Sequence, residues 1–262
     1  MRWNKSAKHI QRKNIKMKNI SIIIATYNAD KVLQRCLNSI RPQKTEEIEL
    51  LIIDGNSKDK TMEIVNNNKD IIDYAVSEPD KGIYDAWNKG IKASTGEWIQ
   101  FLGADDELTP NAIETYLRHV KEEANSAIDI ISGKAYLINR KGKIIGTFGK
   151  PLVWNELRHN MFISHGSTLH NRTFVKKNGS FSLDYKTCAD YEFFVRYGKN
   201  INARFINEYL IKFLIGGTSD SIAAIKETFL IRHKHKSVNQ LVNYYYFTKG
   251  VLGFYIRKLI KL

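Results

Sequence analysis

The sequence predicts an α/β domain with a mostly parallel sheet and flanking helices. Apolar, β-branched runs recur along the first half of the chain, and a polar loop and a stretch with helical spacing follow them. Strands that alternate with helices form βαβ units, in which the strands are parallel. Because these runs are continuously apolar, we expect the strands to be buried.

The individual elements follow from this pattern. Strands are predicted at 20–25, 47–54, 70–78 and 97–103, with helices at 31–40, up to about 67, at 83–94 and at 110–124. Thr109 is the expected N-cap of the last of these helices. Beyond residue 128 the sequence predicts a hairpin that turns at 140–142, a helix at 188–199, two short strands within 202–214 and a helical final segment.

The net charge of +14 is concentrated in the two ends of the chain. Residues 1–18 hold seven Lys and Arg and no acid, and residues 221–262 hold eight with a single acid, Glu227. A neutral body with basic ends argues against a nucleic-acid-binding surface and indicates ends that dock. We therefore divide the chain into a basic tail (1–18), a central domain (19–220) and a basic, aromatic helical segment (221–262).

The cysteine count and the hydropathy narrow the protein class further. Only Cys36 and Cys188 are present, so neither a disulfide scaffold nor a zinc cluster is expected, and a reducing cytosolic compartment fits. No run reaches about 18 uninterrupted apolar residues, so no membrane span is predicted. The basic N-terminus lacks an apolar core, which argues against a secretory signal.

Polar loops follow the predicted strands at 26–30, 54–61, 78–82 and 103–106. Ligands of parallel sheets bind outside the carboxyl ends of the strands, so these loops are the expected site. Asp54 ends its strand and is predicted to point into the crevice, where its carboxylate would accept an N–H group from a nucleobase.

Two adjacent acids, Asp105 and Asp106, end the fourth predicted strand. Mg²⁺ and Mn²⁺ favour carboxylate oxygens, and a metal would offset the repulsion between the two charges. The alternative is a turn at the entry to a helix, where acids are common.

Three stretches of the sequence, SIIIATYN, DGNSKDKT and EPDKGIYDAWNKGIKASTGEWIQFLGADD, resemble the family 2 inverting glycosyltransferases. The similarity is greatest to the subgroup that builds bacterial lipopolysaccharide, capsule and exopolysaccharide, and it covers about residues 19–215. It implies the GT-A fold and a nucleotide-diphospho-sugar donor, most often a UDP-sugar. It also implies a nucleotide-sugar-binding half (19–110) and an acceptor and catalytic-base half (111–220).

The resemblance also implies roles for single residues of the donor site. Ala25, Thr26 and Asn28 would line the nucleotide pocket, Asp54 would contact the base, and Lys81 would lie near the ribose or diphosphate.

For the metal and the diphosphate, the resemblance implies further residues. Asp105 and Asp106 match the family's metal-binding element for Mn²⁺ or Mg²⁺, although this chain has Gly103 where many members carry Asp or Asn. His165 would lie near the donor diphosphate, with a structural histidine as the alternative.

The resemblance places the catalytic base in CADYEFFVRY, at Asp190, with Glu192 as the alternative. Asp190 would take a proton from the acceptor hydroxyl as that hydroxyl attacks the anomeric carbon. Direct displacement of this kind inverts the configuration, as in a metal-dependent hexosyl- or N-acetylhexosaminyltransferase. An acid in the first turn of a helix also stabilises the helix dipole, which is compatible with catalysis.

The C-terminal stretch 237–262 mixes aromatic and aliphatic residues with Lys and Arg. This composition favours an amphipathic helix at an anionic membrane surface, and Lys249 and Arg257 argue against a spanning helix. The alternative is a helix packed on the domain or on a second subunit, which leaves a homodimer open. The resemblance implies an acceptor saccharide carried on polyprenyl diphosphate at the cytoplasmic face of the bacterial membrane. The alternative function is an inactive sugar-nucleotide-binding or assembly subunit.

Overall fold

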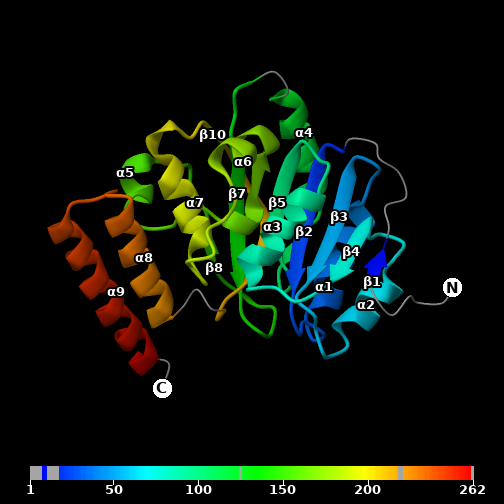
Figure 1. The fold of residues 1–262 in the computed structure, drawn as a ribbon, viewed down its shortest axis with the longest axis horizontal. Helices are drawn as coiled ribbons and strands as arrows, with labels where there is room; N and C mark the ends of the chain where they lie inside the picture. Colours follow the sequence, from blue (N-terminus) through cyan, green and yellow to red (C-terminus); the bar gives the residue numbers. More distant parts are fainter. Residues whose placement is uncertain (1–7, 11–17, 124–125, 218–220, 261–262) are drawn as a thin grey trace.

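A computed structural model describes residues 8–10, 18–123, 126–217 and 221–260 of the chain. Its centre is one twisted sheet with helices on both sides, and a pair of helices forms an outer layer at one end (Figure 1). The strands of the described part are β1 (Lys8–Ile10), β2 (Ile20–Thr26), β3 (Ile48–Asp54), β4 (Tyr74–Ser77), β5 (Trp98–Gly103), β6 (Glu107–Leu108), β7 (Ile130–Ile138), β8 (Ile144–Phe148), β9 (Thr168–Asn171) and β10 (Ala203–Leu214).

In the first half of the described chain, helices alternate with strands, as predicted. The α-helices are α1 (Leu33–Ile40), α2 (Thr61–Asn67), α3 (Ile83–Ala93), α4 (Ala112–Glu122), α5 (Trp154–Leu157), α6 (Arg172–Asn178), α7 (Ala189–Tyr197), α8 (Ile222–Lys234) and α9 (Gln240–Ile260).

The strand order is β1-β4-β3-β2-β5-β9-β7-β10-β6, with β8 paired to β7. Strands β4, β3, β2 and β5 are parallel neighbours, and β10 is parallel to β7. Strand β9 runs antiparallel between β5 and β7, so β7 and β10 point the same way as β2. The carboxyl ends of six strands therefore lie at one edge of the sheet. The prediction of a mostly parallel α/β sheet with flanking helices is confirmed.

Two hydrophobic cores bury the two faces of the sheet. Helices α1, α2 and α4 cover one face, and α3, α6, α7 and α8 cover the other. Within β2, Ile22 and Ile24 contribute to the first core and Ile23 to the second, all at 1% exposure or less. Burial on both sides explains why the central strands are continuously apolar.

Several predicted element bounds are wrong. Where two short strands were predicted within 202–214, one strand, β10, runs from Ala203 to Leu214, and register shifts between Phe205 and Ile211 let it continue past an irregularity. The strand predicted at 70–78 shrinks to β4. Thr109 does not cap α4, because its hydroxyl donates to the Tyr209 carbonyl instead, and Asn111 occupies the N-cap position.

The structure describes four residues of the basic tail at 1–18, namely 8–10 and Lys18. Residues 8–10 form β1, which pairs antiparallel with β4 at the edge of the sheet. The rest of that tail, apart from Lys18, lies outside the described residues.

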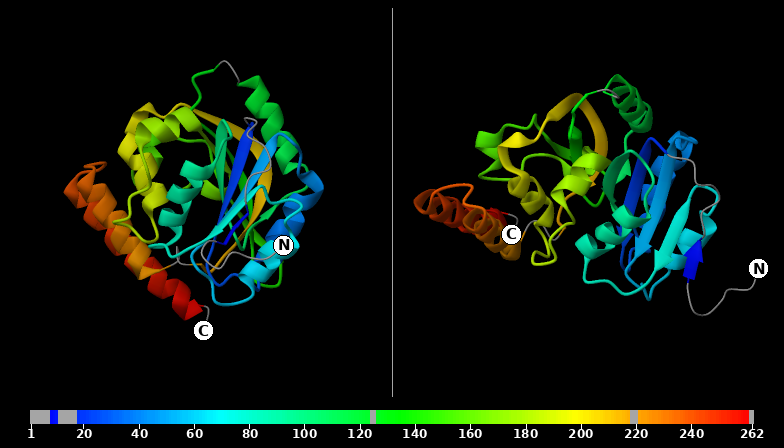
Figure 2. Two further views of the ribbon diagram at one scale, coloured as in Figure 1. Left: turned by 45° about the vertical axis from the view of Figure 1, so that its right-hand side comes forward. Right: turned by 45° about the horizontal axis from the view of Figure 1, so that its top comes forward.

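Helices α8 and α9 form an antiparallel pair outside α7 (Figures 1 and 2). The inner face of α9 packs on α8, where Asn243 accepts a hydrogen bond from buried Arg232 and Gly250 approaches Ile225. In the part of the chain that the structure covers, no helix has both the length and the apolar character that crossing a bilayer requires.

Candidate active site

A pocket of about 490 Å³ opens at the carboxyl edge of the sheet, where β2, β3 and β4 end. It lies where the sequence predicted the ligand, because parallel strands deliver their loops to one edge. Ala25 and Thr26 are among its lining residues, as expected for them. The full lining is Ala25, Thr26, Tyr27, Gly55, Pro79, Asp80, Gly82, Ile83 and Ala86.

The prediction that Asp54 points into this pocket is wrong. Its carboxylate is buried and accepts hydrogen bonds from the hydroxyls of Thr26 and Ser77, at 2.9 and 2.6 Å. The amide and the hydroxyl of Ser57 donate to it as well. Since these donors surround both oxygens, Asp54 ties the ends of β2, β3 and β4 together and is not free to contact a base.

The carboxylate that lines the pocket belongs to Asp80, in the turn before α3. A Cβ atom on Gly55 would lie 2.7 Å from Asp80 Oδ2, so the carboxylate occupies space that a side chain at 55 would fill. The amide of Gly82 donates to Asp80 Oδ1 at 2.8 Å. Partial burial raises the pKa of Asp80. Its only sequence signal was its place in the EPDKG turn.

Asn28 and Lys81 are not among the residues that line the pocket. The side-chain oxygen of Asn28 accepts the Lys58 amide at 2.9 Å, so Asn28 holds the loop after β3. Asn28 itself has a positive φ of 50°, which asparagine tolerates better than most residues. Lys81 is exposed in the turn that carries Asp80, and its amide donates to Asp85.

Asp105 and Asp106 follow β5, the strand next to β2. Asp106 is 4% exposed, and its Oδ1 accepts the amide of Leu214 at the end of β10. Burial, with a smaller contribution from the Asp105 charge, raises the pKa of Asp106 to about 8. Burial also raises the pKa of Asp105.

Gly103 explains how both acids fit at this edge. A Cβ atom there would lie 2.7 Å from Asp106 Oδ2 and 2.9 Å from Asp105 Oδ1. The two carboxylates therefore fill the space that an Asp or Asn at 103 would need. In the sheet, Gly103 pairs with Ala25, which places the acids beside the pocket.

His165 is packed among aromatic rings. Its ring stacks on Trp87 and Phe101, with ring centres 5.1 and 5.5 Å apart. Burial lowers its pKa to about 3, so the ring is neutral. Its neighbour Gly166 approaches Asp106, with a 3.5 Å gap from Asp106 Oδ2 to the position of a Cβ atom. A neutral ring near the acids cannot supply positive charge to a diphosphate.

Asp190 lies in the first turn of α7, against α3. The Tyr84 hydroxyl donates to Asp190 Oδ1 at 3.1 Å, and the Tyr191 amide donates to the same oxygen at 2.8 Å. Tyr84 directly follows Ile83, which lines the pocket, so Asp190 contacts the helix that borders the pocket although 107 residues separate it from Ile83 in the chain. Burial raises the pKa of Asp190.

Glu192, the alternative base, is engaged elsewhere. His235 Nε2 lies 2.8 Å from its Oε1, and Arg196 lies 3.6 Å from its Oε2. The Glu192 side chain is 3% exposed and belongs to the contact between α7 and α8. This arrangement leaves Asp190 as the acid of α7 that contacts α3, the helix that borders the pocket.

No group of three or more His, Cys, Asp or Glu side chains gathers around one point in the described ranges. Two adjacent carboxylates fit a cation that takes its remaining ligands from a diphosphate and water. The sequence pattern assigned no role to Asp80, Tyr84 or Glu227, because their contacts are with segments distant in the chain: Gly55, Asp190 and Thr187, respectively.

Comparison with known structures assigns the fold to the GT-A class of glycosyltransferases. The chain superimposes on S. aureus TarS (residues 1–349, in complex with UDP-GlcNAc) with a TM-score of 0.67 at 16% identity, covering 89% of this chain and 71% of that one. Mannosyltransferase PcManGT from Pyrobaculum calidifontis, in complex with GDP-Man and Mn²⁺, gives a TM-score of 0.62 at 17% identity, covering 86% of this chain and 66% of that one.

Sequence comparison then identifies the family. The model of glycosyl transferase family 2 matches residues 21–178. A PGL/p-HBAD biosynthesis glycosyltransferase from Mycobacterium tuberculosis is 31% identical over 180 residues, 67% of this chain and 68% of that protein. The chain belongs to glycosyl transferase family 2, which confirms the predicted family.

Proposed function

We propose that this protein is an inverting glycosyltransferase that moves a hexosyl or N-acetylhexosaminyl group from a nucleotide-diphospho-sugar to a saccharide acceptor. The observation that carries the proposal is the arrangement at the carboxyl edge of the sheet. There the pocket opens at the end of β2, the acid pair follows the neighbouring strand β5, and the base candidate on α7 is hydrogen-bonded to α3, which borders the pocket. The solved relatives with bound UDP-GlcNAc and GDP-Man support a nucleotide-sugar donor.

In this proposal the pocket binds the nucleoside, and Asp190 removes the proton of the acceptor hydroxyl during attack on the anomeric carbon. The C–O bond to the acceptor forms as the bond to the diphosphate oxygen breaks, so the configuration inverts. The Tyr84 hydrogen bond orients the Asp190 carboxylate. The raised pKa makes that carboxylate a better base than an exposed aspartate.

Asp105 and Asp106 would hold Mn²⁺ or Mg²⁺ together with the donor diphosphate. The bound cation would stabilise the negative charge that develops on the leaving nucleoside diphosphate. The chain's own contribution is to keep two carboxylates side by side, since Gly103 leaves room for them and Leu214 anchors one of them.

Asp80 takes the role that the sequence gave to Asp54. Its carboxylate is the one that faces the pocket, and it can accept a base N–H or a ribose hydroxyl. We expect Asp80→Asn to weaken binding of UDP or the matching nucleoside diphosphate about tenfold, as for a hydrogen bond to a charged group. Titration calorimetry measures the affinity.

Gly55→Ala also tests the role of Asp80 in nucleotide binding, because Gly55 lies against the Asp80 carboxylate. Its new methyl group would displace the Asp80 carboxylate, so it should weaken binding to a similar extent. Glu63→Gln, on an exposed side chain of α2, is the control and should bind as the wild type does. Unchanged affinity in Asp80→Asn would rule out this role.

We further propose that the outer face of α9 docks on an anionic membrane surface that carries a polyprenyl-diphosphate-linked acceptor. The exposed residues of α9 recur at helical spacing and form one apolar stripe opposite the face that packs on α8. The stripe consists of Leu241, Tyr245, Leu252, Ile256 and Leu259, each at least 54% exposed. Lys249, Arg257 and Lys258 on the same helix add positive charge that favours anionic headgroups.

Charge in the stripe should remove this docking. We expect Leu252→Glu/Leu259→Glu to reduce sedimentation with vesicles containing phosphatidylglycerol by about tenfold or more, since each buried CH₂ is worth about 0.8 kcal/mol. Ile144→Glu, exposed on β8, should bind as the wild type does. The opposite result is a wild type that fails to sediment with vesicles and forms a dimer, while the double variant stays monomeric. That result would show that the stripe is a subunit interface.

A screen of nucleotide sugars with Mn²⁺ and Mg²⁺ tests the proposed function. We expect release of a nucleoside diphosphate with one class of donor, faster when a lipid-linked saccharide is added. The alternative is an inactive sugar-nucleotide-binding subunit. Tight nucleotide-sugar binding without turnover over a broad acceptor panel would favour it.

A further inference from the structure

The C-terminal segment contains one acid, Glu227, and it contacts the start of α7. Glu227 Oε1 accepts the amide of Lys186 at 2.8 Å. Its Oε2 accepts the amide of Thr187, the hydroxyl of Thr187 and the amide of Cys188, at 2.9, 2.7 and 2.9 Å. One carboxylate from α8 thus receives the three backbone amides of the residues that lead into α7, together with the Thr187 hydroxyl.

This contact lies directly before Asp190. Cys188 is the N-cap residue of α7, it lacks a side-chain hydrogen bond of the capping type, and Asp190 is the second residue of the helix. The Glu227 carboxylate therefore binds the amides just before the helix and holds the turn that leads into Asp190. A negative charge at this end also stabilises the helix dipole.

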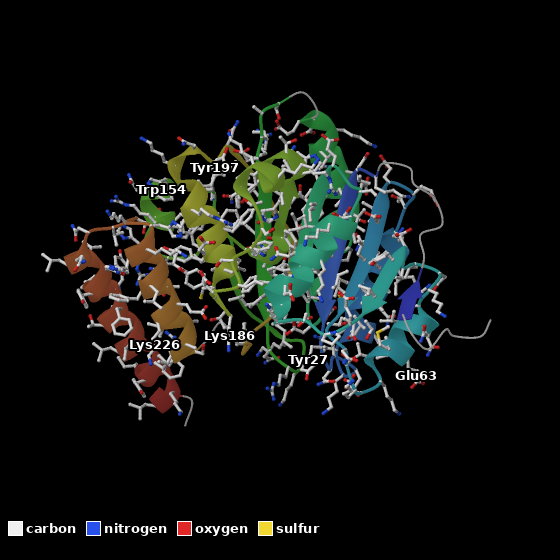
Figure 3. All side chains as sticks on the ribbon, viewed as in Figure 1. Tyr27, Glu63, Trp154, Lys186, Tyr197 and Lys226 are labelled. Carbon is white, nitrogen blue, oxygen red and sulfur yellow. The ribbon has the colours of Figure 1, made fainter. Side chains whose placement is uncertain are left out.

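Other contacts hold α8 in place against the rest of the domain. The Cys188 thiol lies 3.5 Å from the Ala224 carbonyl, one turn before Glu227. At the far end of α8, buried Arg232 donates to the His159 carbonyl and to Asn243 of α9. Lys186 and Lys226, which neighbour the contact, lie on the same side of the molecule (Figure 3). The helix pair is thus a rigid support for the turn that carries Asp190.

We propose that Glu227 is a positioning residue, which sets the place and the basicity of the Asp190 carboxylate from α8. The inference rests on the proposed role of Asp190. Three groups face Asp190 from the elements around it: the Tyr84 hydroxyl of α3, the Cys188 thiol before α7, and Glu227 itself. Burial is the largest cause of the raised Asp190 pKa, and the Glu227 charge also raises it.

The test compares Glu227→Gln with Lys226→Ala, an exposed neighbour on the same helix. Glu227→Gln should lower kcat about 10- to 100-fold and leave the affinity for the nucleoside diphosphate within twofold. Since the base acts deprotonated, the rise of kcat/KM with pH should move to lower pH when the negative charge at 227 is removed. Lys226→Ala should leave kcat and the pH profile unchanged.

A double-mutant cycle with Asp190→Asn separates positioning from general destabilisation. If Glu227 acts through Asp190, Glu227→Gln should cause little further loss in the Asp190→Asn background. A full additional loss there, or a drop in kcat that only follows the folded fraction, would overturn the inference. An inactive wild type would instead defeat the proposed function. An active wild type with Glu227→Gln at full kcat and an unshifted profile would defeat only the role of Glu227.

Discussion

Asp190→Asn is expected to lower the rate of sugar transfer by about 10²- to 10⁴-fold, the range for loss of a general base. The asparagine oxygen can still accept the hydrogen bonds from Tyr84 and the Tyr191 amide, so the fold and the affinity for nucleoside diphosphate should persist. Steady-state transfer and calorimetry on the same preparation measure both quantities.

The pH dependence of the wild type gives a second measure of this residue. Burial raises the pKa of Asp190, and a base must be deprotonated to act. Transfer should therefore rise with pH through a pKa above the usual range of aspartate, about 4. The Asp190→Asn variant should lose this dependence.

Two further variants are the controls for Asp190. Asp184→Asn, an exposed acid that pairs with Lys234 at the surface, should retain full activity, because such pairs contribute little. Glu192→Gln should keep kcat within about tenfold, because Glu192 faces His235 rather than the pocket. An active Asp190→Asn beside an inactive Glu192→Gln would transfer the role of base to Glu192.

Asp106→Asn should slow transfer strongly and at the same time stabilise the metal-free protein. Loss of one carboxylate of the pair should cost on the order of 10²-fold or more in rate, as for other groups that stabilise developing charge. The gain in stability follows from burial, which raises the Asp106 pKa to about 8 in the folded state. A carboxyl whose pKa is higher in the folded state than in the unfolded state lowers the free energy of unfolding as the pH rises from about 4 to 8, because the folded protein must then hold a buried charge.

Thermal unfolding at pH 5 and pH 8, with EDTA or with Mn²⁺, measures this effect. At pH 8 in EDTA the variant should melt above the wild type, by about 2–4 °C for each kcal/mol gained, and the gap should shrink at pH 5. Mn²⁺ should raise the melting temperature of the wild type but not of the variant. A variant that melts below the wild type at both pH values would refute this account of the buried carboxyl.

The sequence alone determined the central architecture and the positions of the two decisive acid motifs. The runs at 20–25 and 97–103 are continuously apolar, so burial on both faces and parallel pairing could be read from them directly. Asp105 and Asp106 follow a predicted strand, which is a local feature of the chain, and the resemblance to family 2 glycosyltransferases singled out Asp190 in CADYEFFVRY. These predictions needed no knowledge of distant contacts.

Only the tertiary structure decided which polar side chains face the pocket. The sequence predicted that the Asp54 carboxylate is available to a ligand. In the structure it accepts hydrogen bonds from Ser57 and Ser77, because β3 pairs with β4. Asp80 lines the pocket because Gly55, 25 residues away, leaves room for its carboxylate. Glu227 is the single acid of the basic segment 221–262, and the sequence pattern assigned it no contact.

The physical reason is that a buried polar group is assigned by its hydrogen-bond partners, and these partners come from other elements. Glu227 finds the donors of 186–188 some 40 residues earlier, when α8 packs beside α7. A local pattern shows where a carboxylate occurs along the chain. The packing of α3, α7 and α8 determines whether it binds a ligand, receives a proton or holds another residue in place.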